Sequence, residues 1–243
     1  MGLRLSDDFA GRNGYQLIGE ANFTGLNDYG GESRNRVELG RITGAHAEYY
    51  QPFGKTGEFF VAPYLEYSAF NFPLSIGGRD TAEYRRSRAL AAAEIGYTPN
   101  ASWRLSGTLE FGHDRAHLRV GDNLPDFSSD VGGVLLRVTR DNLDDSGFPT
   151  RGTRLDLAQE FLLPQLGSDD SATITRLRWD TALSASALDH FLIGGALSSA
   201  GGGDTLIAAY SPLGGLGNLS GFTESQLFAR QTALLRGVYY RRM

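Results

Sequence analysis

Hydrophobic and polar residues alternate along nearly the whole chain. In residues 103–111, Trp103, Leu105, Leu109 and Phe111 share one parity, and the residues of the other parity are polar or charged. The same period of two recurs in residues 153–163 and 173–183, and no helical period of comparable length accompanies it. Because successive side chains of a strand point to opposite faces, this pattern is typical of strands with one apolar and one polar face.

The alternation predicts about twelve strands, separated by turns rich in glycine, asparagine and proline. Several of them exceed the usual strand length of about 5–6 residues, and a tilted strand needs about 9–11 residues to cross a membrane. The predicted strands are residues 2–9, 15–26, 33–41, 45–53, 58–70, 82–98, 102–119, 130–141, 152–163, 172–186, 189–200 and 229–242. Long consecutive hairpins predict an all-β antiparallel meander that closes into a transmembrane β-barrel.

The charges within these strands indicate which face points inward. Arginine shares its parity with aspartate and glutamate, as in Arg176, Arg178 and Asp180, whereas aromatic residues such as Tyr97 and Trp103 gather near strand ends. A transmembrane barrel turns its polar face to a wet lumen and its apolar face to lipid, with aromatic girdles at the two interfaces. The pattern favours such a barrel, and it leaves a soluble sandwich, or a lipocalin-like barrel that binds a small apolar ligand, as the alternative.

Composition excludes several classes of protein. The 23 Lys+Arg residues stand against 28 Asp+Glu, for a net charge of −5, so no basic surplus exists to neutralise the phosphates of a nucleic acid. The absence of cysteine excludes disulfides, thiolate metal sites and a cysteine nucleophile. No secretory signal is visible at the N-terminus, and the longest uncharged run, residues 205–223, contains Pro212 and several glycines and is predicted to be a loop.

Catalytic and metal sites are not predicted. On a strand, His113 and His117 lie about 13 Å apart, which is too far for one ion. The acidic run that begins at Asp141 has Leu143 where an EF-hand loop needs an oxygen ligand, so a structural turn is expected. A serine hydrolase needs Gly-x-Ser-x-Gly, and Ser220 is one place late for that motif. We therefore expect no catalytic residue, no metal ion and no cofactor within this chain.

The inward-facing carboxylates are instead expected to pair with neighbouring arginines in a lattice of ions on the lumen wall. The predicted lumen charges are Arg104, Glu110, Arg137, Arg154, Asp156, Glu160, Arg176, Arg178, Asp180 and Arg236, together with Arg36, Glu38, Arg86, Arg88 and Glu94.

Residues 139–152, Thr-Arg-Asp-Asn-Leu-Asp-Asp-Ser-Gly-Phe-Pro-Thr-Arg-Gly, carry a resemblance to a known family. This segment resembles the turn signature of the bacterial surface antigen superfamily, the outer-membrane barrels of assembly factors and two-partner secretion transporters. Asp141 and Asn142 can accept backbone N–H groups, Pro149 fixes φ, and Gly152 allows tight re-entry to the sheet. The turn-motif residues are Arg140, Asp141, Phe148, Pro149 and Gly152.

Residues 214–222 carry a second resemblance. They lie in the predicted loop 201–228 and look like the loop of that superfamily that folds back into the lumen with a hydrophobic-Arg-Gly-aromatic tip. Ser220 stands at the arginine position, so this chain lacks the side chain with which the family's arginine contacts the barrel wall. The resemblance still implies a plug held by backbone contacts and by Phe222. The predicted lumen-loop residues are Gly215, Leu219, Ser220, Gly221 and Phe222.

Residues 3–9, 47–53 and 59–64 look like the branch whose barrel follows a patatin-like phospholipase, the patatin-like autotransporters. The resemblance implies a type V secretion barrel in the bacterial outer membrane, with membrane lipid and an N-terminal passenger as partners and any lipase activity outside this chain. An outer-membrane protein assembly factor of the same superfamily is the alternative. Because barrels of this superfamily are understood to have sixteen strands, residues 1–243 are expected to be one barrel domain that lacks about four C-terminal strands.

Overall fold

The computed structural model describes residues 2–7, 13–76, 79–121, 124–203, 206–215, 219 and 227–242. Strands dominate this part of the chain, and none of its helices is long and apolar enough to cross a membrane. The elements are β1 (Gly2–Asp7), β2 (Asn13–Phe23), β3 (Glu32–Gly40), β4 (Ile42–Phe53), β5 (Phe59–Ile76), β6 (Arg79–Asn100), β7 (Trp103–Val120), β8 (Phe127–Asp141), β9 (Gly152–Leu162), η1 (Pro164–Leu166), β10 (Ala172–Ser184), β11 (Asp189–Gly202), η2 (Ile207–Ala209), β12 (Ser211–Leu213), β13 (Leu227–Ala229) and β14 (Gln231–Arg241).

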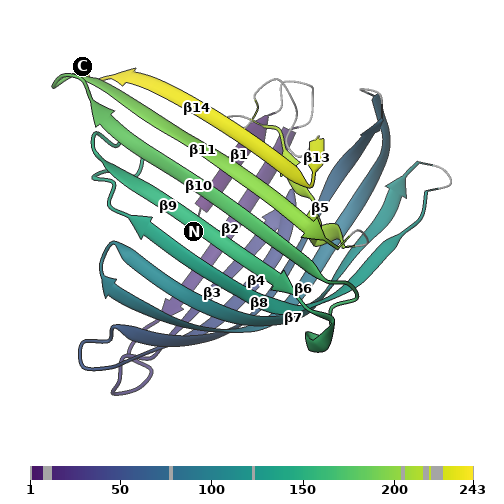
Figure 1. Ribbon diagram of the computed structural model, residues 1–243, viewed down its shortest axis with the longest axis horizontal. Helices are drawn as coiled ribbons and strands as arrows, with labels where there is room; N and C mark the ends of the chain where they lie inside the picture. The colour runs from purple at the N-terminus through teal and green to yellow at the C-terminus, as the bar shows by residue number, and fades with distance from the viewer. Residues whose placement is uncertain are drawn as a thin grey trace.

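The predicted antiparallel meander is confirmed. Each strand from β1 to β11 pairs with its neighbour in the chain, and β14 pairs with β11, which gives one 12-stranded sheet. Figure 1 shows that this sheet curves strongly, like the wall of a barrel, and in the order of the described strands β1 and β14 are its two edges. β12 and β13 form a separate 2-stranded sheet within the segment that was predicted to be a loop.

The two faces of the sheet have the polarity of a membrane barrel. Outward-facing Leu109 and Leu235 are 41% and 73% exposed, whereas inward-facing Glu110 and Glu160 are each 3% exposed. A soluble barrel would bury the leucines and expose the carboxylates. A membrane barrel has lipid outside and a polar interior, so it requires exposed leucines on the outer face and glutamates on the inner face, as seen here.

The polarity of the faces reverses toward one end of β5, β6 and β7. Here the inward side chains are apolar, with Tyr84 and Ala116 buried against Phe72, while the outward ones are polar, including Asn71 and Arg85. In Figure 1 these strands extend past the neighbouring ends of β10 and β11. Because the apolar residues move from the outward to the inward positions, the hydrophobic pattern in the sequence is interrupted here. This explains why β5 and β6 are longer than the predicted ranges 58–70 and 82–98.

The largest apolar core lies between the inner wall and the segment after β11. Leu206, Ala208 and Ala209 are buried against wall residues that include Leu162 and Ile174. The wall beside this cluster carries charged side chains such as Glu160 and Arg176, so the cluster fixes the place where the segment contacts the sheet. The segment 206–215, which contains η2 and β12, therefore lies on the concave side of the wall and is the first element of the site.

Candidate functional site

The inner wall carries the predicted lattice of ion pairs. Because strand alternation turns every second residue inward, arginines and carboxylates of neighbouring strands meet on this face. Pairs between adjacent strands have N–O distances of 2.7 Å for Arg104–Glu94, 3.1 Å for Arg137–Asp156 and 2.8 Å for Arg154–Asp141. Arg36–Glu38, at 2.6 Å, lies within β3, and Arg236–Asp180, at 2.6 Å, reaches across β11 from β14 to β10. The wall is thus highly charged but locally balanced. Arg178 also lies on this face of β10, where its side chain is exposed.

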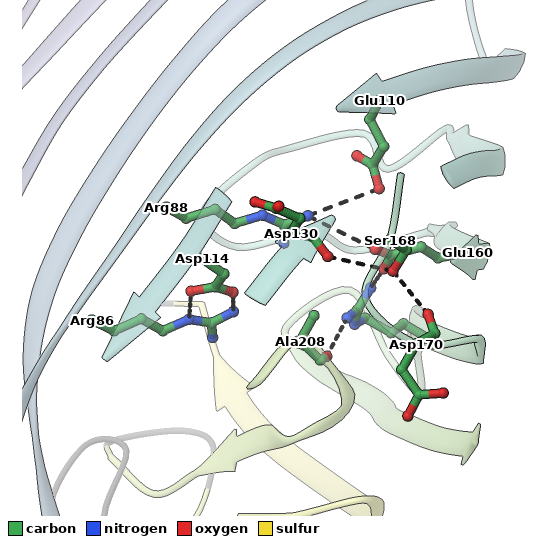
Figure 2. Close-up of polar contacts among 10 residues, drawn as sticks. Arg86, Arg88, Glu110, Asp114, Asp130, Glu160, Ser168, Asp170 and Ala208 are labelled. Atoms are coloured by element: carbon green, nitrogen blue, oxygen red, sulfur yellow. Dashed lines mark hydrogen bonds and ion pairs between the residues drawn. The ribbon is translucent and has the colours of Figure 1, made fainter. Parts of the chain in front are cut away.

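Four charged residues, Arg88, Glu110, Glu160 and Arg176, form a central cluster around two buried glutamates. An Nη2 atom of Arg88 lies 3.8 Å from Oε1 of both glutamates, and Arg176 Nη1 donates to Glu160 Oε2 at 2.7 Å. Figure 2 shows Arg88 reaching toward both carboxylates. Two arginines and two glutamates balance in charge, which offsets part of the cost of removing them from water.

The strand register explains how two glutamates from non-adjacent strands approach each other. β8 lies between β7 and β9, and at this level it contributes Gly133, which pairs with Glu110 on one side and with Leu162 on the other. Because glycine has no side chain, Glu110 and Glu160 can reach the same guanidinium across β8. Beside the cluster, Arg86 holds the fully buried Asp114 through two hydrogen bonds, one of them 2.9 Å from Nε to Oδ1.

The central cluster contacts the segment that lies inside the wall. Arg176 Nη2 donates to the carbonyl of Ala208 in η2 at 3.3 Å, so one side chain joins Glu160 of the wall to the backbone of the segment. Ser198 of β11 and Ser211 of β12 are hydrogen-bonded at 2.6 Å, and Phe228 of β13 packs on a phenylalanine of β5 with ring centroids 4.9 Å apart. Among the described residues, a charged contact, a hydroxyl pair and apolar packing therefore help to hold the segment.

Part of the predicted lumen-loop tip lies next to this segment. Gly215 and Leu219 form an isolated bridge, and Leu219 N–H donates to the carbonyl of Gly215 at 2.9 Å. Gly215 has φ +95°, which favours glycine there. Ser220, Gly221 and Phe222 lie outside the described residues. The sequence analysis did not identify Ala208 and Leu206 as the anchoring residues, although Leu206 to Ala209 is a short apolar run in an otherwise glycine-rich stretch.

The turn between β8 and β9, residues 142–151, is organised by its own acidic side chains. Asp144 accepts from Thr150 N–H at 2.8 Å and from the Thr150 hydroxyl, and Asp145 accepts from Phe148 N–H at 2.8 Å. The hydroxyl bond and the backbone donors lower the pKa of Asp144 from 3.8 to about 2. Gly152 has φ +103°, which is the re-entry geometry expected from the sequence.

This turn also contacts strands other than the two that it connects. The carbonyls of Phe148 and Pro149 accept from Arg242 and Tyr240 at the end of β14, and the Thr150 carbonyl accepts from a serine of β10 at 2.8 Å. These contacts tie β8 and β9 to the last described strand at the end opposite the inner segment. Arg140, the other residue of the motif, faces outward over the ring of Trp103 on β7, 5.3 Å from its centroid.

The histidines that the sequence singled out form two separate pairs. His113 Nδ1 lies 2.7 Å from Asp130, and His117 Nδ1 lies 2.6 Å from Asp126. Across the described ranges, no group of three histidine, aspartate or glutamate side chains has the arrangement of a metal site. A hollow of about 200 Å³ lies beside Arg86 and Arg88 on the inner wall, and another of about 570 Å³ lies at the opposite mouth.

Comparison with known proteins agrees with this architecture. The Omp85 superfamily domain matches residues 22–233 of the chain, from β2 into β14. Among solved structures, the chain is similar to BamA from Haemophilus ducreyi lacking POTRA domains 1–3, with a TM-score of 0.72 and 16% sequence identity. That match covers 92% of this chain and 45% of the BamA chain, so this chain spans less than half of that length. No curated protein matches the sequence. The structural likeness shows a shared fold, and the domain match shows that the chain belongs to the Omp85 superfamily of bacterial outer-membrane β-barrels.

Proposed function

We propose that this chain is the translocator barrel of a type V secretion system, which moves or anchors an N-terminal passenger at the outer membrane. The observation that carries this proposal is the contact between the charged inner wall and the segment 206–215. A barrel with a wet, charged interior provides a path for polar material, and a segment held inside it controls that path.

The ion pairs of the wall suit transit rather than tight binding. Most inward arginines already contact a carboxylate, so a passing polypeptide meets a surface with little unpaired charge of either sign. Such a surface stays hydrated and offers few strong contacts to retain a substrate. The segment 206–215 is the gate in this proposal, and Arg176 is the residue that links the gate to the wall.

The passenger in this proposal is a patatin-like phospholipase. The support is the resemblance of residues 3–9, 47–53 and 59–64 to the patatin-like autotransporters, and the serine in place of arginine at position 220 agrees with that branch. Residues 1–243 are one domain in this proposal, and catalysis is a property of the passenger.

Surface display of a passenger tests this function. An epitope-tagged patatin-like domain is fused ahead of residue 1 and expressed in Gram-negative cells, and the tag is probed with external protease before and after the outer membrane is opened. We expect cleavage in intact cells with this barrel, and none when the same passenger precedes an outer-membrane barrel of another family. A passenger that is protected in intact cells with both barrels would refute secretion by this chain.

A second candidate is an assembly factor for other outer-membrane proteins, and the similarity of the fold to BamA favours it. The two functions differ in what fails when the protein is depleted. Loss of an assembly factor lowers the folded amounts of several unrelated outer-membrane barrels, whereas loss of a dedicated translocator affects its own passenger. Quantitative proteomics of outer membranes after depletion separates the two.

A further inference from the structure

The outward face of β5–β8 changes from apolar to polar along a line that crosses neighbouring strands. The run of apolar outward residues of β7 ends at Phe111, whose partner across the strand pair is Ala91 of β6. Four residues further along β7 the outward residue is Arg115, and its partner on β6 is Ser87. Because the change occurs at matching levels on paired strands, it marks the edge of the lipid-facing band.

This edge lies at the end of the barrel where β11 ends and the longest connection, residues 203–230, begins. In outer-membrane barrels the longer connections are extracellular and the short turns are periplasmic. The polar surface above the band is therefore at the level of the lipid headgroups of the outer leaflet.

Three arginines dominate that surface, and we call Arg85, Arg115 and Arg119 the outer arginine patch. Arg85 of β6 pairs across the strands with His117 of β7, Arg115 is the preceding outward residue of β7, and Arg119 follows His117 at the register shift that pairs Val120 with Glu83. Arg85 is therefore diagonal to Arg115, at about 7–8 Å, and like charges at that separation repel each other. An anion bound between the arginines would remove this repulsion.

Nearby carboxylates do not neutralise the patch by direct contact. Asp126 is engaged by His117 at 2.6 Å, Asp130 by His113 at 2.7 Å, and Glu83 by Asn71 at 3.1 Å. Asp126 is close enough for Arg115 to affect it electrostatically. Nevertheless, Arg85, Arg115 and Arg119 make no hydrogen bond or ion pair within the parts of the chain that the structure describes. This contrasts with the paired arginines of the inner wall.

We propose that the outer arginine patch binds the phosphate groups of a phosphorylated glycolipid in the outer leaflet. The planar guanidinium group presents N–H donors in a fork that matches phosphate oxygens. The patch begins directly above the apolar band, so a lipid whose acyl chains lie against Phe111 places its headgroup beside Arg115. This inference rests on the membrane orientation of the barrel and does not depend on the secretion of a passenger.

Binding of purified glycolipid to the barrel in detergent micelles tests the site. The probe is bisphosphorylated lipid A, titrated against the protein by native mass spectrometry, with dephosphorylated lipid A and inorganic phosphate as separate arms. The test variant is Arg85→Gln/Arg115→Gln, and the matched control is Arg151→Gln/Arg241→Gln, which removes the same charge at the opposite mouth. Folding is checked by the heat-dependent shift in gel mobility of each variant.

We expect the dissociation constant for lipid A to rise about fivefold for each arginine removed, about 25-fold for the pair, with no change in the control. Dephosphorylated lipid A should bind the wild type as weakly as lipid A binds the variant. Equal lipid A affinity of the wild type and the test variant would overturn the proposal. The proposal would also be overturned if dephosphorylated lipid A bound the wild type as tightly as lipid A does. If inorganic phosphate bound as tightly as lipid A, the patch would be a site for free anions and not for a lipid. If the double variant does not fold, the exposed position is tested alone as Arg115→Gln, with the same criteria.

Discussion

Replacement of Arg176 by methionine tests whether the inner segment is held to the wall by a charged contact. The substitution keeps most of the aliphatic stem and removes both the bond to Glu160 at 2.7 Å and the bond to the Ala208 carbonyl at 3.3 Å. A hydrogen bond to a charged group contributes about 1.5–3 kcal/mol. Since the Arg176 side chain is 40% exposed, we take the lower limit for the Ala208 contact, about 1.5 kcal/mol. That value corresponds to about a tenfold rise in the population of the detached segment.

Loss of the pair with Glu160 has a separate effect on the whole barrel. Breaking a buried ion pair costs about 3–5 kcal/mol, but the exposure of Arg176 and the remaining Arg88, 3.8 Å from Glu160, reduce this. We expect the free energy of unfolding in lipid vesicles to fall by about 1–3 kcal/mol. The apolar contacts of Leu206 and Ala209 are unchanged, so the segment should still return to the wall.

Two measurements follow the segment itself, namely the open probability in planar bilayers and the rate at which protease cleaves residues 206–215. Both should rise about tenfold in Arg176→Met. The control is Arg104→Met, because Arg104 also pairs with a glutamate at 2.7 Å and has a similarly exposed side chain, but is not among the residues that bond the segment. Unchanged values in Arg176→Met would refute the anchoring role. Equal increases in both variants would show that lumen charge, rather than the Ala208 contact, controls opening.

Three further substitutions test the turn, the packing of β8 and the lipid-facing band. The pKa of Asp144 is lowered to about 2, so its carboxylate supports the turn fully above pH 3.8 and loses this effect as the pH falls through about 2. Protection of the Thr150 and Arg151 amides, which donate to Asp144, should follow that curve in the wild type and be flat in Asp144→Asn, and identical curves would contradict it. A Cβ at Gly132 would lie 2.0 Å from a carbonyl of η1, so Gly132→Ala should lower the free energy of unfolding by about 1–3 kcal/mol, whereas Gly19→Ala, with nothing within 4 Å, should not. In lipid vesicles, Leu109→Arg should lower the free energy of unfolding by about 2–4 kcal/mol. Leu188→Arg, at a similarly exposed position in a turn, should change it little, and equal decreases in the two variants would place Leu109 outside the lipid-facing band.

The sequence predicted the faces of the sheet more reliably than it predicted contacts. Alternation alone places Leu109 outward and Glu110 inward, because both follow from the period of a strand. It also predicted that inward carboxylates would meet arginines. It did not predict which ones would meet, since Glu110 and Glu160 share Arg88 only because β8 offers Gly133 at that level. Such a contact depends on the register of three strands.

The inner segment shows a second reason why prediction from sequence is incomplete. β12 and β13 each have three residues, too few for a period of two to be visible, and Pro212 with its neighbouring glycines is typical of a loop. What holds the segment is its burial against the wall and the bond from Arg176 to a backbone carbonyl, and a backbone carbonyl has no signature in a sequence.

The contrast between inner and outer arginines joins these observations. Among the described residues, the more buried arginines of the inner wall, such as Arg86 and Arg88, contact carboxylates of neighbouring strands, which offsets part of the cost of removing them from water. Above the lipid band the same strands carry Arg85 and Arg115 on the opposite face, where carboxylates are present but engaged by histidines. Because these arginines make no direct pair within the described residues and begin at the edge of the lipid-facing band, a phosphate-bearing headgroup is the partner that we propose for them. The lipid A titration decides between that partner and a purely hydrated surface.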